Sequence, residues 1–406
     1  MRILWLLPVL PFPPDTGGKQ DPYYMISILS SLGDQITAAP VYRQDKPPDV
    51  PAEFAALVSD TVFLPGNPKS TYLRLFESLS DTLPFKLRQY YSEKAIGIVH
   101  DLLTRTPPYD VVIADHLHLV PVALESRKLV LDSGGTPPLF VLRTPNVESI
   151  IVEKYAHRID NPLVKTFAGR EAVKMKAYET KVLGEFDLVA AISPVDADIL
   201  RTMSMEPDRI VCVTAGVDVD NLRPSDEEPK RGEVVFVGSF DWHPNVDGAL
   251  WMIEKVWPSV LHRIPDAHLS LVGRNPPPYL RKAEQKSIAV TGRVESVGDY
   301  IRNASAVAVP LWIGSGMRLK ILEAFAHGKP VVSTSLGAEG IEANDGEHIL
   351  IRDDPAEFAD ALVKVLKDRL LQRTLGANAR ALVERKYSWS KVTGDLRAAI
   401  EQRLAR

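Results

Sequence analysis

The chain has 406 residues, of which 45% are hydrophobic and 25% are charged, and its formal net charge is −4. These values indicate a soluble globular protein of two or three domains and argue against binding to nucleic acid. The single cysteine, Cys212, excludes an internal disulfide and fits a reducing, cytoplasmic compartment.

The N-terminal segment MRILWLLPVLPFPP is the first element to interpret. Its charged start and apolar run are compatible with a signal peptide, but four prolines interrupt the run and no small-residue cleavage site follows. A buried strand over 3–7 is the better prediction. No later run approaches the ~18–20 apolar residues of a membrane span, so only peripheral contact with the inner face of a membrane stays open.

Short apolar runs predict strands that alternate with helices along the whole chain. Strands are expected at 3–7, 111–114, 139–142, 188–192, 210–213, 234–237, 269–272, 288–290, 306–309 and 331–332. Helices are expected at 71–80, 87–104, 163–183, 245–261, 355–367, 369–386 and 389–404. This alternation predicts α/β layers with parallel sheets, covered on both faces where the strands are continuously apolar.

A polar segment rich in charged residues, 219–233, separates two α/β halves. It predicts a linker between an N-terminal domain, 1–218, and a C-terminal domain, 219–388. The break before residue 389 predicts that the last helix, 389–406, crosses back to the N-terminal domain.

Two loops of the first half follow expected strands and carry residues suited to ligand binding. Gly17 and Gly18 permit close backbone approach just before a helix, although they are explained equally well by an ordinary turn. Asp115, His116 and His118 follow the strand 111–114, at the edge where open α/β sheets bind ligands. Asp115 and His116 could position an acceptor hydroxyl or take its proton; the alternative is a capping acid beside a half-exposed histidine.

Two loops of the second half repeat this arrangement. Gly238 and Ser239 end the strand 234–237, directly before a helix that Pro244 begins. Gly292 and Arg293 end the strand 288–290, and their loop is expected one strand away from the GSGMRLK loop described next. Backbone groups near Arg293 could read a nucleobase, with a plain surface arginine as the alternative.

The segment 314–332, GSGMRLKILEAFAHGKPVV, is the most informative in the chain. Glycines such as Gly316 turn backbone N–H groups toward an anion, and a helix with a positive N-terminal end follows. Arg318 and Lys320 can neutralise a diphosphate, and Glu323 can accept hydrogen bonds from the two hydroxyls of a sugar. The alternative is a solvated helix face on which Glu323 pairs with one of the cations. The combination favours a nucleotide or sugar-nucleotide site.

At these residues the chain resembles a known family. The segments FVGSFDWHPN, LVGRNPPP, VTGRVES, GSGMRLKILEAFAHGKPVVST and LGAEGI resemble the donor half of glycosyltransferase family 4. The first half resembles the same family more weakly, through PPDTGGKQ and the loop at Asp115 and His116. The resemblance implies the GT-B fold, in which two Rossmann-like domains with parallel sheets face each other across a cleft.

The resemblance also implies an activity: retaining transfer of a sugar from a nucleotide-diphosphate sugar to a glycan, lipid-linked or small-molecule acceptor, in polysaccharide or glycoconjugate biosynthesis. The expected catalytic residues are Asp115, His116, Arg318 and Lys320. The expected donor-binding residues are Gly18, Gly238, Ser239, Arg293, Ser315, Gly316, Arg318, Leu319, Lys320 and Glu323.

The chain departs from the family pattern at three places, two of which concern donor binding; the third is RTPN, where many relatives carry a histidine before the asparagine. Ser315 stands where relatives often carry the glutamate that contacts the donor sugar, and FDWHP replaces a stretch that usually supplies an arginine. Arg318 and Lys320 are therefore expected to provide the cations for the diphosphate, with no metal or other cofactor. Two alternatives remain, a sugar-nucleotide epimerase of the same fold and a non-catalytic protein that binds nucleotide sugars.

Overall fold

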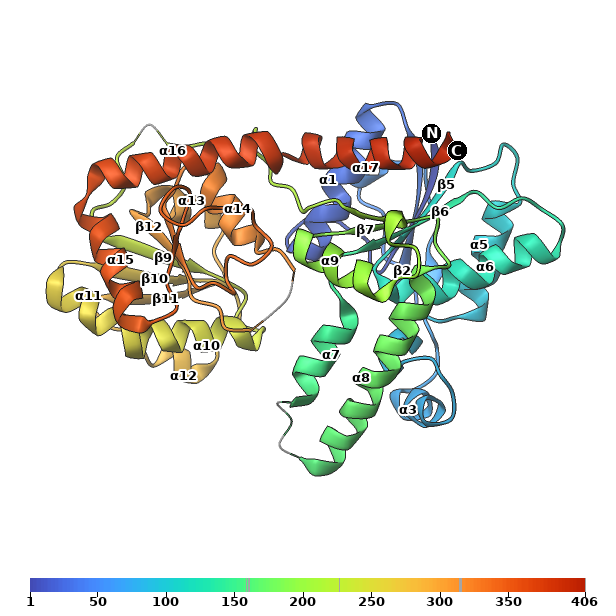
Figure 1. Cartoon of the computed structure of the whole chain (residues 1–406), viewed down its shortest axis with the longest axis horizontal. Helices are drawn as coiled ribbons and strands as arrows, with labels where there is room; N and C mark the ends of the chain where they lie inside the picture. Colours follow the sequence, from blue (N-terminus) through green and yellow to red (C-terminus); the bar gives the residue numbers. More distant parts are fainter. Residues whose placement is uncertain (158, 160, 226, 314–315, 406) are drawn as a thin grey trace. The chain divides into compact units, whose positions relative to one another are not determined.

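The computed structural model describes residues 1–157, 159, 161–225, 227–313 and 316–405. The chain forms two compact units (Figure 1), here called unit 1 (Met1–Thr214 with Thr393–Arg406) and unit 2 (Ala215–Val392). The expected division after residue 218 lies slightly later than the structural one. The reason is that Val217 already belongs to unit 2, where its N–H donates to the carbonyl of Tyr387 at 2.7 Å. Segment 219–233 therefore lies within unit 2.

Unit 1 contains one parallel sheet with the strand order β3-β2-β1-β5-β6-β7-β8, and β4 pairs with β2. Its strands are β1 (Arg2–Leu7), β2 (Gln35–Tyr42), β3 (Asp60–Thr61), β4 (Leu64–Pro65), β5 (Val111–Asp115), β6 (Leu139–Thr144), β7 (Leu188–Ala191) and β8 (Ile210–Cys212). Its helices are α1 (Gly17–Ser31), α2 (Ala52–Ala55), α3 (Thr71–Ser80), α4 (Phe85–Arg88), α5 (Glu93–Leu103), η1 (Leu117–Leu119), α6 (Val120–Asp132), α7 (Glu148–His157), α8 (Pro162–Leu183), α9 (Pro194–Met203) and η2 (Pro207–Arg209).

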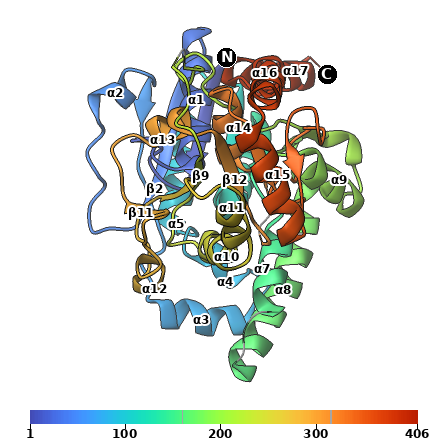
Figure 2. The same cartoon turned by 90° about the vertical axis from the view of Figure 1, so that its left-hand side faces the viewer.

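Helices α7 and α8 form a hairpin that projects from unit 1 beside α3 (Figure 1, Figure 2). Helix α8 begins at Pro162, where the side chain of Asn161 caps the first turn. The expected helix 87–104 is interrupted, because Ser92 starts α5 as its N-cap and accepts a hydrogen bond from the N–H of Ala95. Among the described residues, no helix is both long and apolar enough to cross a bilayer.

Unit 2 also contains one parallel sheet, with the order β11-β10-β9-β12-β13-β14. Its strands are β9 (Glu233–Val237), β10 (His268–Val272), β11 (Ile288–Gly292), β12 (Ala306–Val309), β13 (Val331–Ser333) and β14 (Leu350–Ile351). Its helices are α10 (His243–Trp251), η3 (Met252–Val256), α11 (Trp257–Arg263), α12 (Pro278–Arg281), α13 (Val297–Asn303), α14 (Leu319–Ala326), α15 (Pro355–Lys367) and α16 (Arg369–Lys386).

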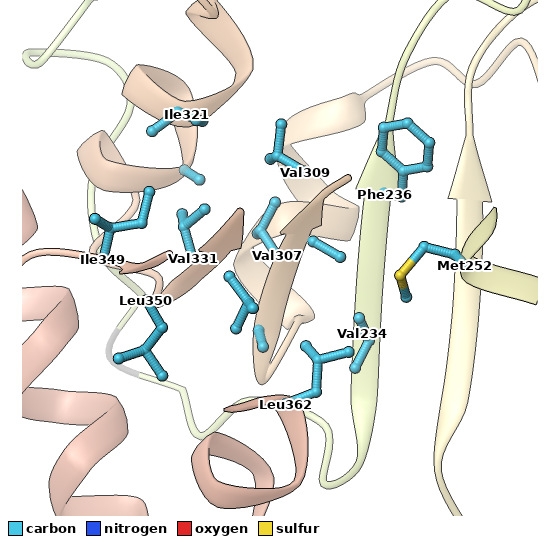
Figure 3. Close-up of a cluster of buried hydrophobic side chains, with 14 of the residues drawn as sticks. Val234, Phe236, Met252, Val307, Val309, Ile321, Val331, Ile349, Leu350 and Leu362 are labelled. Atoms are coloured by element: carbon cyan, nitrogen blue, oxygen red, sulfur yellow. The ribbon is translucent and has the colours of Figure 1, made fainter. Parts of the chain in front are cut away.

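The core of unit 2 fixes the position of α14. Phe236 on β9, Val307 on β12 and Val331 on β13 are fully buried in one apolar cluster, to which α14 contributes Ile321 (Figure 3). Burying an aliphatic side chain of this size stabilises the fold by about 1.5–3 kcal/mol. The residues that flank Ile321 in the sequence are therefore held close to the carboxyl ends of β9 and β12.

The last helix, α17 (Trp389–Leu404), begins in unit 2 and continues into unit 1 from Thr393 onward. In unit 1, Nε of Arg397 donates to Oδ2 of Asp34 at 3.0 Å. Oδ1 of the same carboxylate accepts a hydrogen bond from the N-terminal amino group of Met1 at 2.6 Å. These ion pairs tie the C-terminal helix to the first strand of unit 1.

Candidate functional site

The sheet of unit 2 changes direction in strand order between β9 and β12. In open α/β sheets, ligands bind beside the carboxyl ends of the strands at such a switch point. The loop after β9 begins with Gly238 and Ser239, and the loop after β12 leads through Gly316 and Arg318 into α14. The structure therefore brings the two expected donor loops of unit 2 to the strands that flank one switch point.

Asn245 braces the first of these loops. It lies on α10, is 4% exposed, and donates from Nδ2 to the carbonyl of Ser239 at 2.7 Å. A Cβ atom at position 238 would come within 2.7 Å of the Asn245 side chain, so Gly238 is needed for this close approach. Asn245 is absent from the residues expected in the site, because an asparagine close to a helix start is explained equally well as a cap.

Lys320 reaches Asn245 from the second loop. Its Nζ donates to Oδ1 of Asn245 at 2.8 Å and lies 5.0 Å from the centroid of the Phe236 ring. Although part of the residue is exposed, loss of water around the ammonium group lowers the pKa of Lys320 to about 7. The positive charge of Arg318 lowers this pKa further, and the carboxylate of Glu323 opposes the decrease. A dehydrated cation with a neutral partner is well placed to bind an anion.

Arg318 is 6% exposed and donates from Nη1 to the carbonyl of Gly316 at 2.9 Å. Gly316 has a φ of 74°, a left-handed conformation that favours glycine and turns the loop toward α14. The alternative of a solvated helix face does not hold for Arg318, which is buried, and Lys320, although partly exposed, is bound to Asn245.

Leu319 and Glu323 belong to α14 itself. Leu319 is the first residue of the helix, where backbone N–H groups have no acceptor within the helix and the macrodipole is positive. Glu323 is half-buried and lies three residues after Lys320, on the same side of the helix. Their roles in donor binding stay predictions. Ser315, expected beside the donor sugar, lies outside the described residues.

A polar cluster after β10 holds Ser239 from its other side. Nε of Arg274 donates to Oγ of Ser239 at 3.1 Å and lies 3.3 Å from Oδ2 of Asp241. Nδ2 of Asn275 donates to the same carboxylate oxygen at 3.0 Å and is the main cause of the lowered pKa of Asp241. Ser239 is thus held between Asn245 and Arg274, and neither contact could be read from spacing alone.

Arg293 is exposed directly after β11, which is the edge strand of the sheet. Strands β10 and β9 separate β11 from β12, so the expectation that Arg293 lies one strand from the GSGMRLK loop is wrong. The reason is that the doubly wound order places successive strands on opposite sides of β9. A role of this loop in reading a nucleobase stays a prediction.

Unit 1 has a switch point of the same kind between β1 and β5. Gly18 lies in the first turn of α1, after β1, and Asp115 ends β5 with His116 directly behind it. The N-cap residue of α1, Thr16, makes no side-chain hydrogen bond to the helix. The backbone carbonyl of Thr16 instead accepts hydrogen bonds from the N–H groups of Lys19 and Gln20, at 2.9 and 2.8 Å. The N–H groups of Gly17 and Gly18, which precede them, are the ones that a helix start offers to an anion.

Asp115 is buried in an ion network and is 1% exposed. Its Oδ2 accepts from Nη1 of Arg143 and from Nε1 of Trp5, both at 3.2 Å, while Nη2 of Arg143 donates to Asp21 at 2.6 Å. Burial alone would raise the pKa of Asp115, but Arg143 and His116 outweigh it and the pKa is lowered. For Asp21, burial prevails and raises the pKa. Asp115 is consequently ionised, and its carboxylate interacts with neighbouring side chains rather than with solvent.

His116 connects this network to the surface. Its Nδ1 lies 3.2 Å from Oδ1 of Asp115, and its side chain is 18% exposed. Its backbone has φ 71° and ψ 149°, a region that is almost restricted to glycine and costs about 1–3 kcal/mol for other residues. His118 is buried against Tyr90, and dehydration lowers its pKa well below the usual value. His116 is therefore the histidine of this loop that can meet a ligand.

Metal-ligating side chains do not cluster in the part of the chain that the structure describes. Within these ranges, no group of three or more His, Cys, Asp or Glu side chains is arranged to hold a metal ion.

Comparison with known proteins places this chain among sugar-transferring enzymes. Residues 231–368 match the family model for glycosyl transferases group 1. The phosphatidyl-myo-inositol mannosyltransferase of Mycobacterium leprae is 29% identical over 318 residues, which are 72% of this chain and 80% of that protein.

Solved structures show the same fold. Sucrose-phosphate synthase from Thermosynechococcus elongatus has a TM-score of 0.74 and 17% identity, with 100% of this chain and 99% of that one covered. The Anabaena protein HepE, in complex with UDP and glucose, has a TM-score of 0.67 and 13% identity, with 99% of each chain covered. With its two parallel α/β sheets and these relatives, the chain is a glycosyltransferase with the GT-B fold, and it is similar to family 4.

Proposed function

We propose that this glycosyltransferase uses a nucleotide-diphosphate sugar as donor and transfers the sugar with retention of configuration to a glycan, lipid-linked or small-molecule acceptor. The similar HepE structure contains UDP and glucose, and the similar mycobacterial enzyme is named for a lipid acceptor. The proposal includes a cytoplasmic location with peripheral membrane contact and requires no metal or other cofactor.

One observation carries the donor assignment: Lys320 is held by Asn245 between the two loops that flank the switch point of unit 2. A diphosphate bound there would meet the Lys320 ammonium, the Arg318 guanidinium and the first-turn N–H groups of α14. Glu323, one turn further along, would accept hydrogen bonds from the ribose hydroxyls. The remaining proposed donor contacts are Gly18, Gly238, Ser239, Arg293, Ser315, Gly316 and Leu319.

The chemical step breaks the bond between the anomeric carbon and the diphosphate oxygen. The acceptor oxygen forms its new bond on the same face of the sugar and passes its proton to the departing diphosphate oxygen, so no nucleophile from the protein is needed. Negative charge develops on the departing diphosphate, where preorganised cations and N–H groups stabilise it. Lys320 and Arg318 are the proposed source of this stabilisation.

His116 is the proposed contact to a reacting or positioning hydroxyl group. Asp115 would keep the Nδ1 side of the imidazole directed inward, so that Nε2 points away from the buried network. Arg143 and Trp5 would in turn fix the Asp115 carboxylate. Asp115 thus becomes a positioning residue for His116.

A two-stage experiment tests the proposal. Thermal unfolding is first measured with UDP, GDP, ADP and their sugar derivatives, and one nucleotide is expected to raise the midpoint. Release of that nucleoside diphosphate is then followed with lipid-linked or glycan acceptors. If Arg318→Ala leaves the affinity for the nucleoside diphosphate unchanged, the phosphate position is wrong.

The same samples distinguish the two alternatives. An epimerase would convert the donor sugar without an acceptor, which NMR of the donor alone detects. A non-catalytic binding protein would bind the nucleotide sugar and leave it intact with every acceptor.

A further inference from the structure

Helix α3 turns its apolar side toward solvent. Tyr72 is 84% exposed, Leu73 55%, Phe76 72% and Leu79 45%. Their spacing places them along one side of a helix, whereas the residue of α3 that is fully buried is Ser78. This is the reverse of an ordinary surface helix, whose apolar stripe faces the core.

Contacts with α8 fix α3 in this orientation. Nη2 of Arg170 donates to the carbonyl of Leu79 at 2.7 Å, and Nζ of Lys174 donates to the carbonyl of Ser78 at 2.6 Å. These two cations satisfy carbonyls in the last turn of α3 and complement its dipole. Ser70 caps the other end through the N–H of Leu73. The outward direction of the apolar side is therefore built into the fold of unit 1.

The start of α8 extends the same apolar surface. Leu163 is 83% exposed and Val164 is 50% exposed. Both views show α3 and the start of α8 at the same end of unit 1 (Figure 1, Figure 2). We call these six side chains the α3–α8 surface: Tyr72, Leu73, Phe76, Leu79, Leu163 and Val164.

Positive charge flanks the α3–α8 surface, although the whole chain has a net charge of −4. Helix α8 carries five basic residues and two acidic ones, and Lys165, Arg170 and Lys176 among them are exposed. Apolar and aromatic side chains beside cations are typical of helices that lie in the interface of an anionic bilayer. A binding site for another acidic surface would need the cations but not six exposed apolar side chains.

We propose that the α3–α8 surface docks on an anionic lipid bilayer, with the helix α3 lying in the headgroup region. This inference deepens the membrane contact of the proposed function and rests on that part of it alone. It does not depend on the donor site, because every residue of the surface belongs to unit 1 and none binds the nucleotide. The occupant is a lipid surface rather than a second copy of the chain.

The test is flotation of the full chain with vesicles, in the absence of nucleotide. One set contains phosphatidylcholine alone, and the other contains about one third phosphatidylglycerol. The wild type is expected to float with the anionic vesicles more than with the neutral ones, and to be released by salt. The double variant Leu73→Ser, Phe76→Ser is expected to bind at least about tenfold more weakly, since less apolar area enters the bilayer.

Leu370→Ser is the matched control, because Leu370 is 75% exposed on α16 of unit 2 and carries no role here. It should float as the wild type does. Thermal unfolding of all three proteins should agree, because the substituted side chains are exposed. Nucleotide binding measured on the same samples reports the donor site separately, so the two proposals can fail independently.

Three results would overturn the inference. The wild type could fail to float with anionic vesicles, or the double variant could float equally well. Alternatively, size-exclusion chromatography could show a wild-type dimer that the double variant loses, which would make a second copy the occupant.

Discussion

The switch points of the two units share a strand order but treat charge in opposite ways. In unit 1, Arg143 lies between the carboxylates of Asp21 and Asp115, at 2.6 and 3.2 Å. In unit 2, Lys320 has the neutral amide of Asn245 as its hydrogen-bond partner, and its pKa is lowered to about 7. At the first site, the charge of Arg143 is balanced by buried carboxylates. At the second site, the loss of water destabilises the positive charge of Lys320.

This difference suggests a division of work between the units. A compensated network gains nothing from an added anion and serves to fix geometry, here that of His116. A dehydrated cation gains interaction energy when a diphosphate arrives, and the gain is larger because water is already displaced. In the proposed function, the negative part of the donor accordingly binds to unit 2, and unit 1 orients a hydroxyl group.

The largest expected effect comes from breaking the compensated network. Arg143→Met leaves two buried carboxylates without their cation, which should lower the free energy of unfolding by about 3–5 kcal/mol. Urea denaturation measures this change. Arg263→Met is the control, because Arg263 pairs with Asp360 at the surface and should cost no more than about 1 kcal/mol. If both variants lost the same free energy of unfolding, Arg143 would be no more important to stability than a surface ion pair, and the contrast between the two units would be wrong.

Removal of Lys320, whose hydrogen-bond partner is neutral, should affect catalysis instead. Lys320→Met is expected to lower the turnover number by about 10²–10³-fold, which corresponds to about 2.7–4 kcal/mol, while the protein stays folded. Release of nucleoside diphosphate is the measurement. Lys286→Met, at an exposed lysine of the same unit, should retain full activity. A Lys320→Met enzyme with unchanged turnover would remove Lys320 from the mechanism.

Substitutions of His116 should lower activity, and the glycine substitution should at the same time relieve backbone strain. His116→Ala and His116→Gly both lose the imidazole, so each should lower sugar transfer by about 10²-fold while nucleotide affinity stays constant. The glycine variant should be more stable than the alanine variant by about 1 kcal/mol or more, because glycine adopts φ 71° without strain. Kinetics and urea denaturation of the pair test both statements. Equal stability would show that the backbone at this position is unstrained.

The smallest expected effect concerns pH. The Lys320 ammonium is charged below its pKa of about 7 and loses its proton above it, so affinity for a nucleoside diphosphate should fall as pH rises through this range. Asn245→Asp places a carboxylate beside Nζ, which favours the charged form and should move the decline upward by about one pH unit. Calorimetric titration between about pH 6 and pH 9 measures it.

Asn245→Ala serves as the control for this shift. This substitution removes the hydrogen bond to Lys320 but adds no charge. It should therefore weaken nucleotide binding without moving the decline in affinity to higher pH. If the alanine and aspartate variants displaced the decline equally, the titrating group would not be Lys320.

Much of the fold could be predicted from periodicity. All ten expected strands are present, because short, continuously apolar runs are typical of the buried strands of a parallel sheet. Strand β2 was not predicted, since QITAAPVY contains small residues and Pro40 in place of a β-branched run. The order of the strands in the sheet could not be predicted from the sequence either. For this reason, Arg293 was expected one strand away from the loop after β12, whereas two strands separate β11 from β12.

The candidate site could be predicted only in part. Arg318, Lys320 and Glu323 can be named as candidates from the sequence, because they lie within one loop and one helix turn. The contact of Asn245 with Lys320 cannot be predicted, because 75 residues separate the two in the sequence. For the same reason, no pattern in the sequence connects Asp21 with Arg143, 122 residues further along.

The sequence alone determined that this chain alternates strands and helices and that a glycine loop with two cations precedes a helix, because both are local patterns of residue type and spacing. The tertiary structure decided which of the charged residues are neutralised. Burial and long-range hydrogen bonds set the pKa of a group, and they arise only when strands distant in sequence become neighbours. In the sequence, Arg143 and Lys320 are both simply basic residues. In the folded protein, Arg143 pairs with two carboxylates, whereas Lys320 donates to the neutral amide of Asn245.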